Sequence, residues 1–412
     1  MSTTTYVNNK TQTQAKLHNF LFEPNIYIAA LITLKGDLTA EDIASAVKKA
    51  YTQNETTMSK IILENGKAYF QALSETGCKV SIDTRDWREI MHQSEKDTFR
   101  INEGELIRTY IIPREDAFLL FVMAHHIAGD GTSLVLFTED ILNDLAGKEV
   151  AYRPLNDKGV INVPRTTKFP IKSIIGLKLL NQKWKKTGKV FTWEDYFHIH
   201  EAFWKNRQSD IRIKEIEGNE LRRIKSECKE LGITVNSYVF NMLLRERPES
   251  KTISFPFSTR GTNRALSNQV MTIKIPYKYN NALSFEENAK NVHKAIYEYL
   301  ENDEKKFHIA IASGLLDPIL MDGALMHTYT GYENEAAEQI AHIWGYIGDE
   351  KSDLGVTNIK NVDIETDYTT FAVKDFAFIA AGMSSTKDVV SVSTLKNRMT
   401  LCDCNITNMV RS

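Results

Sequence analysis

The sequence predicts an α/β protein of the α+β sandwich type, in which mixed sheets are covered by helices. Three observations support this prediction. Apolar runs of strand length and helical stripes of apolar residues occur in both halves of the chain. The strands do not alternate strictly with helices, as they would in a doubly wound parallel sheet. The chain also has 412 residues, which is long for one hydrophobic core and favours two domains.

The first half contains strands and helices in mixed order. A strand is expected over residues 25–34, followed by a helix over 40–53 in which Thr39 and Asp42 form a capping box. A helix that begins at Thr132 or Ser133 ends at Gly147, because glycine favours helix termination. Short strands and a hairpin are expected between these helices, over residues 58–63, 68–72, 79–82, 105–112 and 117–124.

A change of composition separates the two halves. Prolines interrupt residues 148–205, and no acidic residue occurs between Lys158 and Thr192. We predict a crossover here that carries one amphipathic helix over 171–186. The chain is therefore divided into a first half at 1–160, a basic crossover linker at 161–205 and a second half at 206–412.

The second half returns to helices and strands. Asn219 is expected to cap a helix that Gly232 closes, and Thr234 is expected to cap another helix over 235–245. A long helix is expected over 284–301. Strands are expected over residues 252–258, 271–276, 369–381, 389–394 and 399–404.

Composition and charge exclude several classes of protein. The formal net charge is −2, which excludes a globally basic nucleic-acid-binding protein. The longest apolar runs, at 26–34 and 117–124, are shorter than the ~18–20 residues that a membrane-spanning helix needs. Residues 1–16 are polar and carry no secretory signal pattern. We expect a soluble, cytoplasmic protein.

The cysteines are too few for a disulfide framework. Cys402 and Cys404 lie on one face of an expected strand, but two further soft metal ligands are missing nearby in the sequence. We therefore expect Cys78, Cys228, Cys402 and Cys404 to be reduced thiols and expect no metal site.

The segment most informative about function is His125-His126-Ile127-Ala128-Gly129-Asp130-Gly131. It lies between the strand expected at 117–124 and a helix, so a strand end positions two imidazoles and a turn positions a carboxylate. The unperturbed pKa of histidine lies close to cytoplasmic pH, and a neutral imidazole can accept a proton from a hydroxyl or an amine. The pattern predicts acid–base chemistry at this turn.

The H-H-x-x-x-D-G pattern, in a strand–turn–helix setting, resembles the signature of the condensation-domain and chloramphenicol-acetyltransferase-like acyltransferases. Only this motif is specific by itself, but weaker matches extend the resemblance over most of the chain. They are Thr259-Arg260-Gly261 with Asn268-Gln269-Val270, the loop-like Ser352-Asp353-Leu354-Gly355, and residues 391–394 with 397–401. Asparagine is more usual than Asp353 in the family. The Asp-Phe-Gly-Trp-Gly motif of the plant branch is absent, and the chain resembles the free-standing bacterial branch, akin to alcohol acetyltransferases.

The resemblance implies two similar mixed-sheet domains that form a V, with a tunnel between them. Both halves lie on one chain, so a monomer is implied. Carried over by position, His126 is the catalytic base and His125 a supporting neighbour. Asp130 would pair with an arginine of the second half, Arg260 or, as the fallback, Arg264.

Three further positions gain a role from the same resemblance. Gly131 matches a position where only a hydrogen atom lets the turn tighten into the next helix. Ser393 or Thr394 is the candidate for stabilising the tetrahedral oxyanion or contacting the substrate.

The implied reaction moves an acyl group from a coenzyme A or carrier-protein thioester to a small-molecule alcohol or amine. It requires no covalent enzyme intermediate and no permanently bound cofactor. Two alternatives remain open: an amide-forming, stand-alone condensation protein of the nonribosomal-peptide type, and a non-catalytic scaffold or binding module. The sequence names neither substrate.

Other polar residues have competing interpretations. Asp130 could be a second catalytic acid, although a carboxylate four residues after the base is better placed to hold the turn. His198 and His200 have the spacing of a metal-binding pair, but they lie in the crossover without a partner carboxylate in rigid register, so solvated or packing roles are favoured.

The crossover is basic and amphipathic. Apolar residues recur at helical spacing at Ile171, Ile174, Leu177, Leu180 and Trp184. The basic residues beside them are Arg165, Lys168, Lys172, Lys178, Lys183, Lys185, Lys186 and Lys189. A helix packed on the domain seam is favoured. There are two alternatives. Residues 165–189 could form a peripheral helix on an anionic membrane, or they could form a phosphate-binding surface for coenzyme A or a phosphopantetheine carrier.

Overall fold

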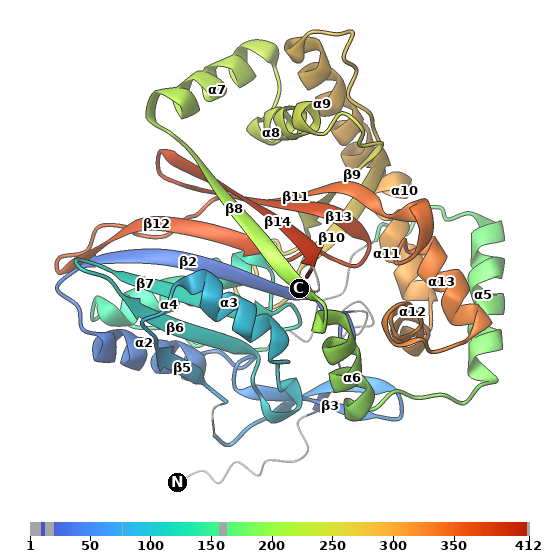
Figure 1. The fold of residues 1–412 in the computed structure, drawn as a ribbon, viewed down its shortest axis with the longest axis horizontal. Helices are drawn as coiled ribbons and strands as arrows, with labels where there is room; N and C mark the ends of the chain where they lie inside the picture. The colour runs from blue at the N-terminus through green and yellow to red at the C-terminus, as the bar shows by residue number, and fades with distance from the viewer. Residues whose placement is uncertain (1–9, 13–19, 76, 156–162, 410–412) are drawn as a thin grey trace.

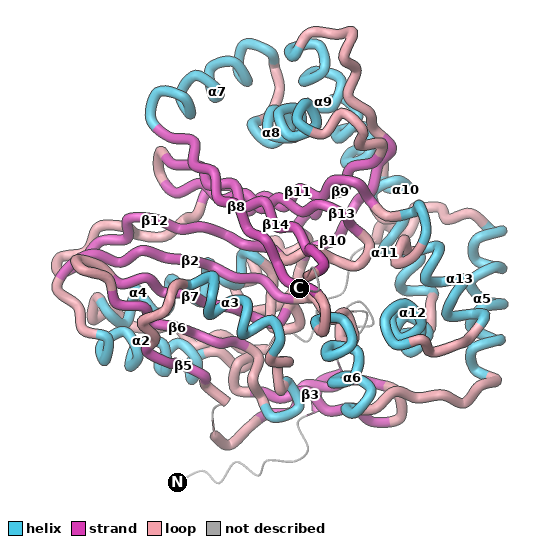
Figure 2. The backbone as a smooth tube through the Cα atoms, viewed as in Figure 1, coloured by secondary structure: helices cyan, strands magenta, loops and turns pink. Residues whose placement is uncertain are grey.

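Two large β-sheets and their helices make up most of the molecule (Figure 1). The computed structural model describes residues 10–12, 20–75, 77–155 and 163–409. In these residues a five-stranded sheet has the order β12-β2-β7-β6-β5, and a six-stranded sheet has the order β10-β9-β11-β13-β14-β8. A small third sheet has the order β1-β4-β3. Figure 2 shows the two large sheets meeting near the middle of the molecule. The expected mixed-sheet α/β class is confirmed.

The elements of the first half follow the sequence expectation closely. The helix α2 (Ala40–Gln53) begins with the capping box of Thr39 and Asp42, and α4 (Gly131–Leu145) follows the histidine motif. Its strands are β1 (Lys10–Gln12), β2 (Tyr27–Gly36), β3 (Ser59–Glu64), β4 (Lys67–Ala72), β5 (Lys79–Ile82), β6 (Ile107–Pro113) and β7 (Phe118–His125). Of the polar segment at residues 1–16, all but residues 10–12 lies outside the described residues.

Two helices of this part were not predicted from the sequence. The helix α3 (Trp87–Lys96) is capped by Asp86, and its buried residues include Trp87, Ile90 and Met91. The helix α6 (Trp193–Trp204) lies in the crossover and begins with a capping box of Thr192 and Asp195. Both carry apolar residues at helical spacing, but each is short, and α6 is also rich in aromatic residues, which are weak helix formers.

The second half is built on the six-stranded sheet. Helices α7 (Gly218–Leu231), α8 (Val235–Glu246) and α9 (Phe285–Glu301) lie along one side of it in Figure 1. Its strands are β8 (Arg207–Glu217), β9 (Thr252–Ser258), β10 (Val270–Pro276), β11 (Ser352–Asn361), β13 (Thr386–Leu395) and β14 (Arg398–Asn408). The helices α10 (Asp303–Lys306), α11 (His308–Leu315), α12 (Pro318–Thr330) and α13 (Glu335–Ile343) form a separate group beside α5 (Ile171–Lys185).

Two local expectations for the second half are wrong. Asn219 does not cap α7; the N-cap is Glu217, which makes no side-chain capping bond. The segment 352–355 is not a loop but the start of β11, which pairs in parallel with both β9 and β13. Asp353 helps to position this start of β11, because its carboxylate accepts hydrogen bonds from the backbone amides of Lys251 (2.8 Å) and Thr252 (3.1 Å). This carboxylate fixes the start of β9 beside β11.

The division of the chain at residue 206 does not separate two independent halves. The strand β12 (Phe371–Ala380) comes late in the sequence but pairs antiparallel with β2, which makes it an edge strand of the first sheet. Ser391 Oγ donates to Phe378 O (2.7 Å) and Ser393 Oγ donates to Phe376 O (3.0 Å). These bonds join β13 of the second sheet to β12 of the first.

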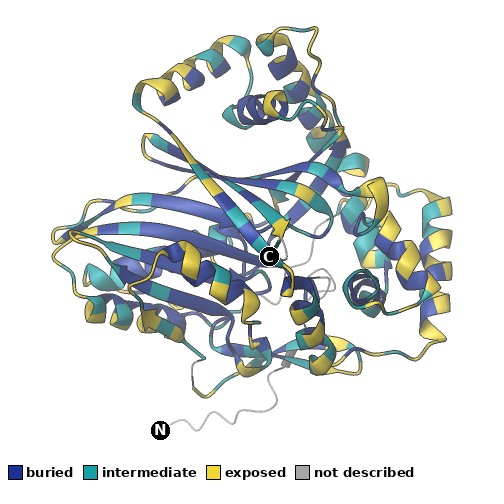
Figure 3. Ribbon diagram, viewed as in Figure 1, coloured by how far each residue is buried: buried dark blue, intermediate teal, exposed yellow. Residues whose placement is uncertain are grey.

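The buried residues, which are dark blue on the ribbon in Figure 3, form two main cores. The larger core includes the first sheet together with parts of α5, α6, α12 and α13. The second lies between the six-stranded sheet and α7, α8 and α9. The four cysteines are free thiols. Among the described residues no single helix is long and apolar enough to span a membrane; α11 and α12 meet the criterion only as a pair, bent by 98°.

Candidate active site

The histidine motif forms a tight turn between β7 and α4. Asp130 is the N-cap of α4: its Oδ1 accepts from Ser133 N (3.0 Å), and Ser133 Oγ accepts from Asp130 N (3.2 Å). This reciprocal pair satisfies backbone donors that the first helical turn leaves without partners. Gly131 is required by packing, because a Cβ there would lie 2.4 Å from Ile359 Cγ2 and 2.9 Å from Phe378 Cζ. The glycine therefore lets the second half approach the turn.

His125 is the last residue of β7 and is almost fully buried. Its Nδ1 accepts a hydrogen bond from Ile127 N (3.2 Å), and its ring meets Phe99 edge-on. Burial, with smaller contributions from His200 and His126, holds the pKa of His125 well below its usual value. His125 is thus a neutral residue that shapes the turn.

His126 lies one residue further, in the wall of the large cavity between the halves. Its backbone N–H donates to Ile26 O (2.9 Å), which ties the turn to the start of β2. The imidazole stacks on Phe20, with ring centroids 5.5 Å apart and planes within 11°. At the edge of the ring, Asn268 Nδ2 lies 3.0 Å from His126 Nδ1. The ring is held on several sides while remaining part of the cavity wall.

Asn268 controls which nitrogen of His126 carries the proton. Asn268 Oδ1 accepts from Val270 N (3.3 Å), which turns the amide NH₂ toward His126 Nδ1. In this orientation Nδ1 is the acceptor, and the neutral ring carries its proton on Nε2. A half-turn of the amide places Oδ1 against Nδ1–H and makes Nε2 the basic nitrogen. In the sequence Asn268 is only part of a family pattern, and no local signal gives it a role.

Asp130 and Arg260 form a buried ion pair between the two halves. Arg260 Nη2 lies 2.8 Å from Asp130 Oδ1, and both side chains are almost fully buried. The other carboxylate oxygen, Oδ2, accepts from Gln269 N (2.9 Å). Asp130 therefore points into the loop between β9 and β10, the same loop that carries Asn268. This geometry favours the structural role of Asp130 over that of a second catalytic acid.

Two of the other expected positions take different places. The fallback residue Arg264, whose side chain is more than half exposed, pairs instead with Glu139. The oxyanion role expected for Ser393 does not fit the structure. Ser393 is fully buried, and its hydroxyl donates to Phe376 O and accepts from Phe378 N (3.2 Å), so it joins β13 to β12 and is not free to stabilise an oxyanion. Thr394 does line the cavity.

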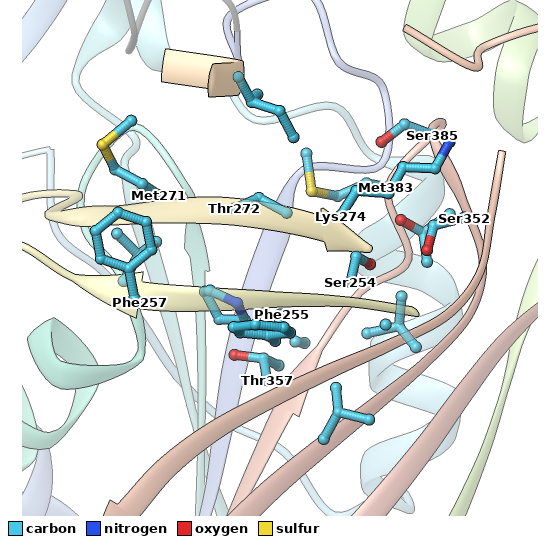
Figure 4. Close-up of a pocket in the computed structure, with 18 of the residues that line it drawn as sticks. Ser254, Phe255, Phe257, Met271, Thr272, Lys274, Ser352, Thr357, Met383 and Ser385 are labelled. Atoms are coloured by element: carbon cyan, nitrogen blue, oxygen red, sulfur yellow. The ribbon is translucent and has the colours of Figure 1, made fainter. Parts of the chain in front are cut away.

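The cavity has a volume of about 2340 Å³ and receives residues from both halves. His126, Asp130 and Thr132 come from the first half, and strands β9, β10, β11 and β13 supply much of the opposite wall. Figure 4 shows apolar side chains of Phe255, Phe257 and Met271 in one part of this wall. Ser254, Lys274, Ser352, Met383 and Ser385 line another part. The cavity is large enough for two organic substrates to meet at His126.

Glu23 is a second ionisable residue in the cavity wall, and no pattern in the sequence marks it as a site residue. It is almost fully buried, and its Oε1 accepts from both the hydroxyl and the backbone N–H of Ser384. Tyr329 OH in turn donates to Ser384 Oγ (2.6 Å). Burial raises the pKa of Glu23 to about 7, although Ser384 and Lys351 act in the opposite direction.

Glu23 should make the stability of the fold depend on pH. Its pKa is higher in the folded chain than the value of 4.5 expected when unfolded, so the folded state alone keeps the proton between those values. Each pH unit in this range is worth about 1.4 kcal/mol. We expect the free energy of unfolding to fall by roughly 3 kcal/mol more in the wild type than in Glu23→Gln as pH rises from about 4.5 to 7. Urea unfolding at several pH values measures this difference; parallel curves would contradict it.

The histidine pair of the crossover lies in α6. His200 is buried, packs against Tyr196 with ring centroids 4.5 Å apart, and is close enough to His125 to lower the pKa of that residue. Burial lowers the pKa of His200 itself to about 3. In the described part of the chain no group of three or more histidine, cysteine, aspartate or glutamate side chains is arranged to hold a metal ion.

Solved structures similar to this chain include two condensation domains and a wax ester synthase/diacylglycerol acyltransferase. The first condensation domain of the CDA synthetase is 13% identical, with a TM-score of 0.60, covering 97% of this chain and 91% of that one. The condensation domain of the monacolin K polyketide synthase MokA is 10% identical, with a TM-score of 0.60, covering 98% and 93%. The wax ester synthase/diacylglycerol acyltransferase from Marinobacter aquaeolei VT8 is 10% identical, with a TM-score of 0.53, covering 95% and 91%.

Sequence comparison adds no nearer relative. No family model matches the chain, and no curated protein matches it. The structural likeness nevertheless covers nearly the full length of the chain, and it shows that the two-lobed condensation-domain fold expected from the histidine motif is present.

Proposed function

We propose that this protein is an acyltransferase that moves an acyl group from a thioester to an alcohol or amine. The observation that carries the proposal is the position of His126 in the wall of the inter-half cavity, with its ring held by Phe20 and Asn268. A histidine fixed in this way, at a place where two substrates can meet, suits proton transfer during attack on a carbonyl. The shared fold with condensation domains and a wax ester synthase supports the same chemistry.

The proposed reaction needs no covalent enzyme intermediate. In the tautomer in which Asn268 Oδ1 accepts from Nδ1–H, His126 Nε2 takes the proton of the acceptor O–H or N–H as the acceptor oxygen or nitrogen bonds to the thioester carbonyl carbon. The carbonyl electrons move to oxygen and form a tetrahedral oxyanion, for which Thr394 in the cavity wall is the candidate donor. Collapse of this intermediate breaks the C–S bond, and His126 returns the proton to the leaving thiolate. Coenzyme A and phosphopantetheine carriers are the proposed donors.

One chain suffices for the proposed site. His126 belongs to the first half and Asn268 to the second half of the same chain, and the ion pair of Asp130 and Arg260 joins the same two halves. We therefore propose a monomeric enzyme. The intact ring environment also argues against a non-catalytic scaffold, which has no chemical need for a fixed histidine in a cavity wall.

A thioester-cleavage assay tests the proposal directly. The wild-type protein is incubated with a panel of acyl-CoA donors of increasing chain length, alone and with alcohol or amine acceptors, while thiol release and product mass are measured. We expect thiol release that depends on an acceptor. Ester products support an alcohol acyltransferase, and amide products support the condensation alternative. Absence of turnover with both coenzyme A and carrier-bound donors would leave the scaffold interpretation and overturn the proposal.

A further inference from the structure

The helix α5 has two apolar faces, of which the described residues cover only one. Leu177, Leu180 and Trp184 are buried in the larger core, where Trp184 stacks on Phe191 and lies against Gly323. On the opposite side, Ile171 is 73% exposed, and Ile175 and Leu179 are each 54% exposed. Three large apolar side chains spaced four residues apart thus form a stripe that faces solvent. We call these three residues the outer stripe.

Lysines border the outer stripe on both sides. Successive residues of an α-helix are turned by about 100°, so Ile171 and Leu179 lie about 40° to either side of Ile175. By the same geometry Lys172 and Lys183 lie about 60–80° to one side, and Lys178 and Lys185 about 60–80° to the other. All four lysines are exposed. One of them, Lys183, forms a solvent-exposed ion pair with Glu335, which contributes little to stability.

The outer stripe also adjoins the cavity. Lys168 and Pro170, which lead directly into α5, line the cavity together with Ala310, Ser313 and Gly314 of the neighbouring helix α11. Phe169 packs against His308, with ring centroids 4.8 Å apart. The first turn of α5 is therefore anchored at the rim of the proposed active site, and a surface bound by the outer stripe would lie next to that rim.

We infer that α5 binds peripherally to an anionic lipid bilayer. In this arrangement the outer stripe enters the boundary between headgroups and acyl chains, and the two rows of lysines contact anionic headgroups. A soluble phosphate ligand would engage the lysines but would leave Ile171, Ile175 and Leu179 in water. The symmetric placement of charge on both sides of an apolar stripe fits a plane better than a pocket. Residues 158–192 also contain no acidic side chain to oppose the interaction.

The structure changes which residues test this inference. The sequence pattern placed Trp184 on the apolar face of interest, but Trp184 is a core residue, so its replacement would perturb folding. The informative variant is Ile171→Ser/Ile175→Ser/Leu179→Ser. Ile82→Ser/Tyr152→Ser is the matched control, since Ile82 and Tyr152 are 50% and 60% exposed far from α5 in the sequence. A third variant, Lys172→Ser/Lys178→Ser/Lys185→Ser, removes charge and keeps the stripe.

Co-sedimentation with lipid vesicles is the experiment. The full-length protein and its variants are mixed with phosphatidylcholine vesicles, with or without phosphatidylglycerol, at low and at physiological salt. We expect the wild type and the control to bind the anionic vesicles, more strongly at low salt. The outer-stripe variant should bind at least ~10-fold more weakly. The lysine variant should lose the preference for anionic lipid.

Several results would overturn the inference. The wild type could bind neither kind of vesicle at either salt concentration, the outer-stripe variant could bind as well as the wild type, or the control variant could also bind more weakly than the wild type. Binding of coenzyme A or an acyl carrier protein that depends on these lysines, without vesicle binding, would assign the surface to a soluble partner instead. The inference does not depend on acyl transfer, because vesicle binding is measured without substrate. Circular dichroism of each variant verifies that the fold is intact.

Discussion

Replacing His126 by alanine is expected to lower acyl transfer by at least about 100-fold, because the only proton-accepting ring proposed for the reaction is removed. The fold should be retained, since the backbone N–H of residue 126 still donates to Ile26 O. Acceptor-dependent thiol release measures the loss, and circular dichroism with thermal unfolding provides the control for folding. Turnover near the wild-type level in a folded His126→Ala protein would refute the proposed mechanism.

Variants of Asn268 distinguish whether His126 acts by accepting a proton or by donating a hydrogen bond. In Asn268→Asp the carboxylate can only accept from Nδ1–H, which makes Nε2 the basic nitrogen, and it can still accept from Val270 N. If His126 is the base, Asn268→Asp should retain activity within about 10-fold of wild type, while Asn268→Leu should lose more. If His126 acts by donating Nε2–H, Asn268→Asp should be as inactive as His126→Ala.

Replacing Asp130 by alanine is expected to destabilise the fold by about 3–5 kcal/mol, because it leaves the guanidinium of Arg260 buried without its carboxylate. The pair is almost fully buried, with Arg260 Nη2 2.8 Å from Asp130 Oδ1. The same substitution removes the N-cap of α4 and the bond to Gln269 N, so activity should fall as well. The midpoint of urea unfolding measures the stability.

A surface ion pair provides the matched control for this effect. Asp116 pairs with Lys35, but both side chains are more than half exposed, so Asp116→Ala should cost less than about 1 kcal/mol. In addition, Asp130→Asn/Arg260→Met should recover part of the stability lost in Asp130→Ala, because no buried charge is left unpaired. An Asp130→Ala protein that unfolds at the wild-type midpoint would exclude the structural role and favour direct participation of Asp130 in the chemistry.

Local signals in the sequence determined most of the regular elements near the site. The capping box at Thr39 and Asp42 marked the start of α2, and the apolar run before His125 marked β7. Such features depend on residues a few positions apart, so a single sequence contains them completely. The histidine motif is local in the same sense, which is why it indicated both the fold and the central residue of the site.

The contacts that complete the site depend on the tertiary structure. Asn268 lies 142 residues from His126 in the sequence, and no local pattern shows that its amide contacts His126 Nδ1. Ser393 fits an oxyanion role by position in a strand, yet β12 crosses into the first sheet and engages its hydroxyl. Glu23 becomes a group with a raised pKa only because the folded chain buries it, which no local pattern in the sequence shows.

The helix α5 shows the same division. Its residues determined that the segment is helical and basic, and its bounds agree with the pattern to within one residue at the end. The sequence could not determine which apolar residues face the core, because Ile171, Leu177 and Leu179 are equally apolar and a helix with apolar residues on two sides has no unique inner face. Packing of Trp184 against Phe191 and Gly323 decided that question, and it left Ile171, Ile175 and Leu179 outside.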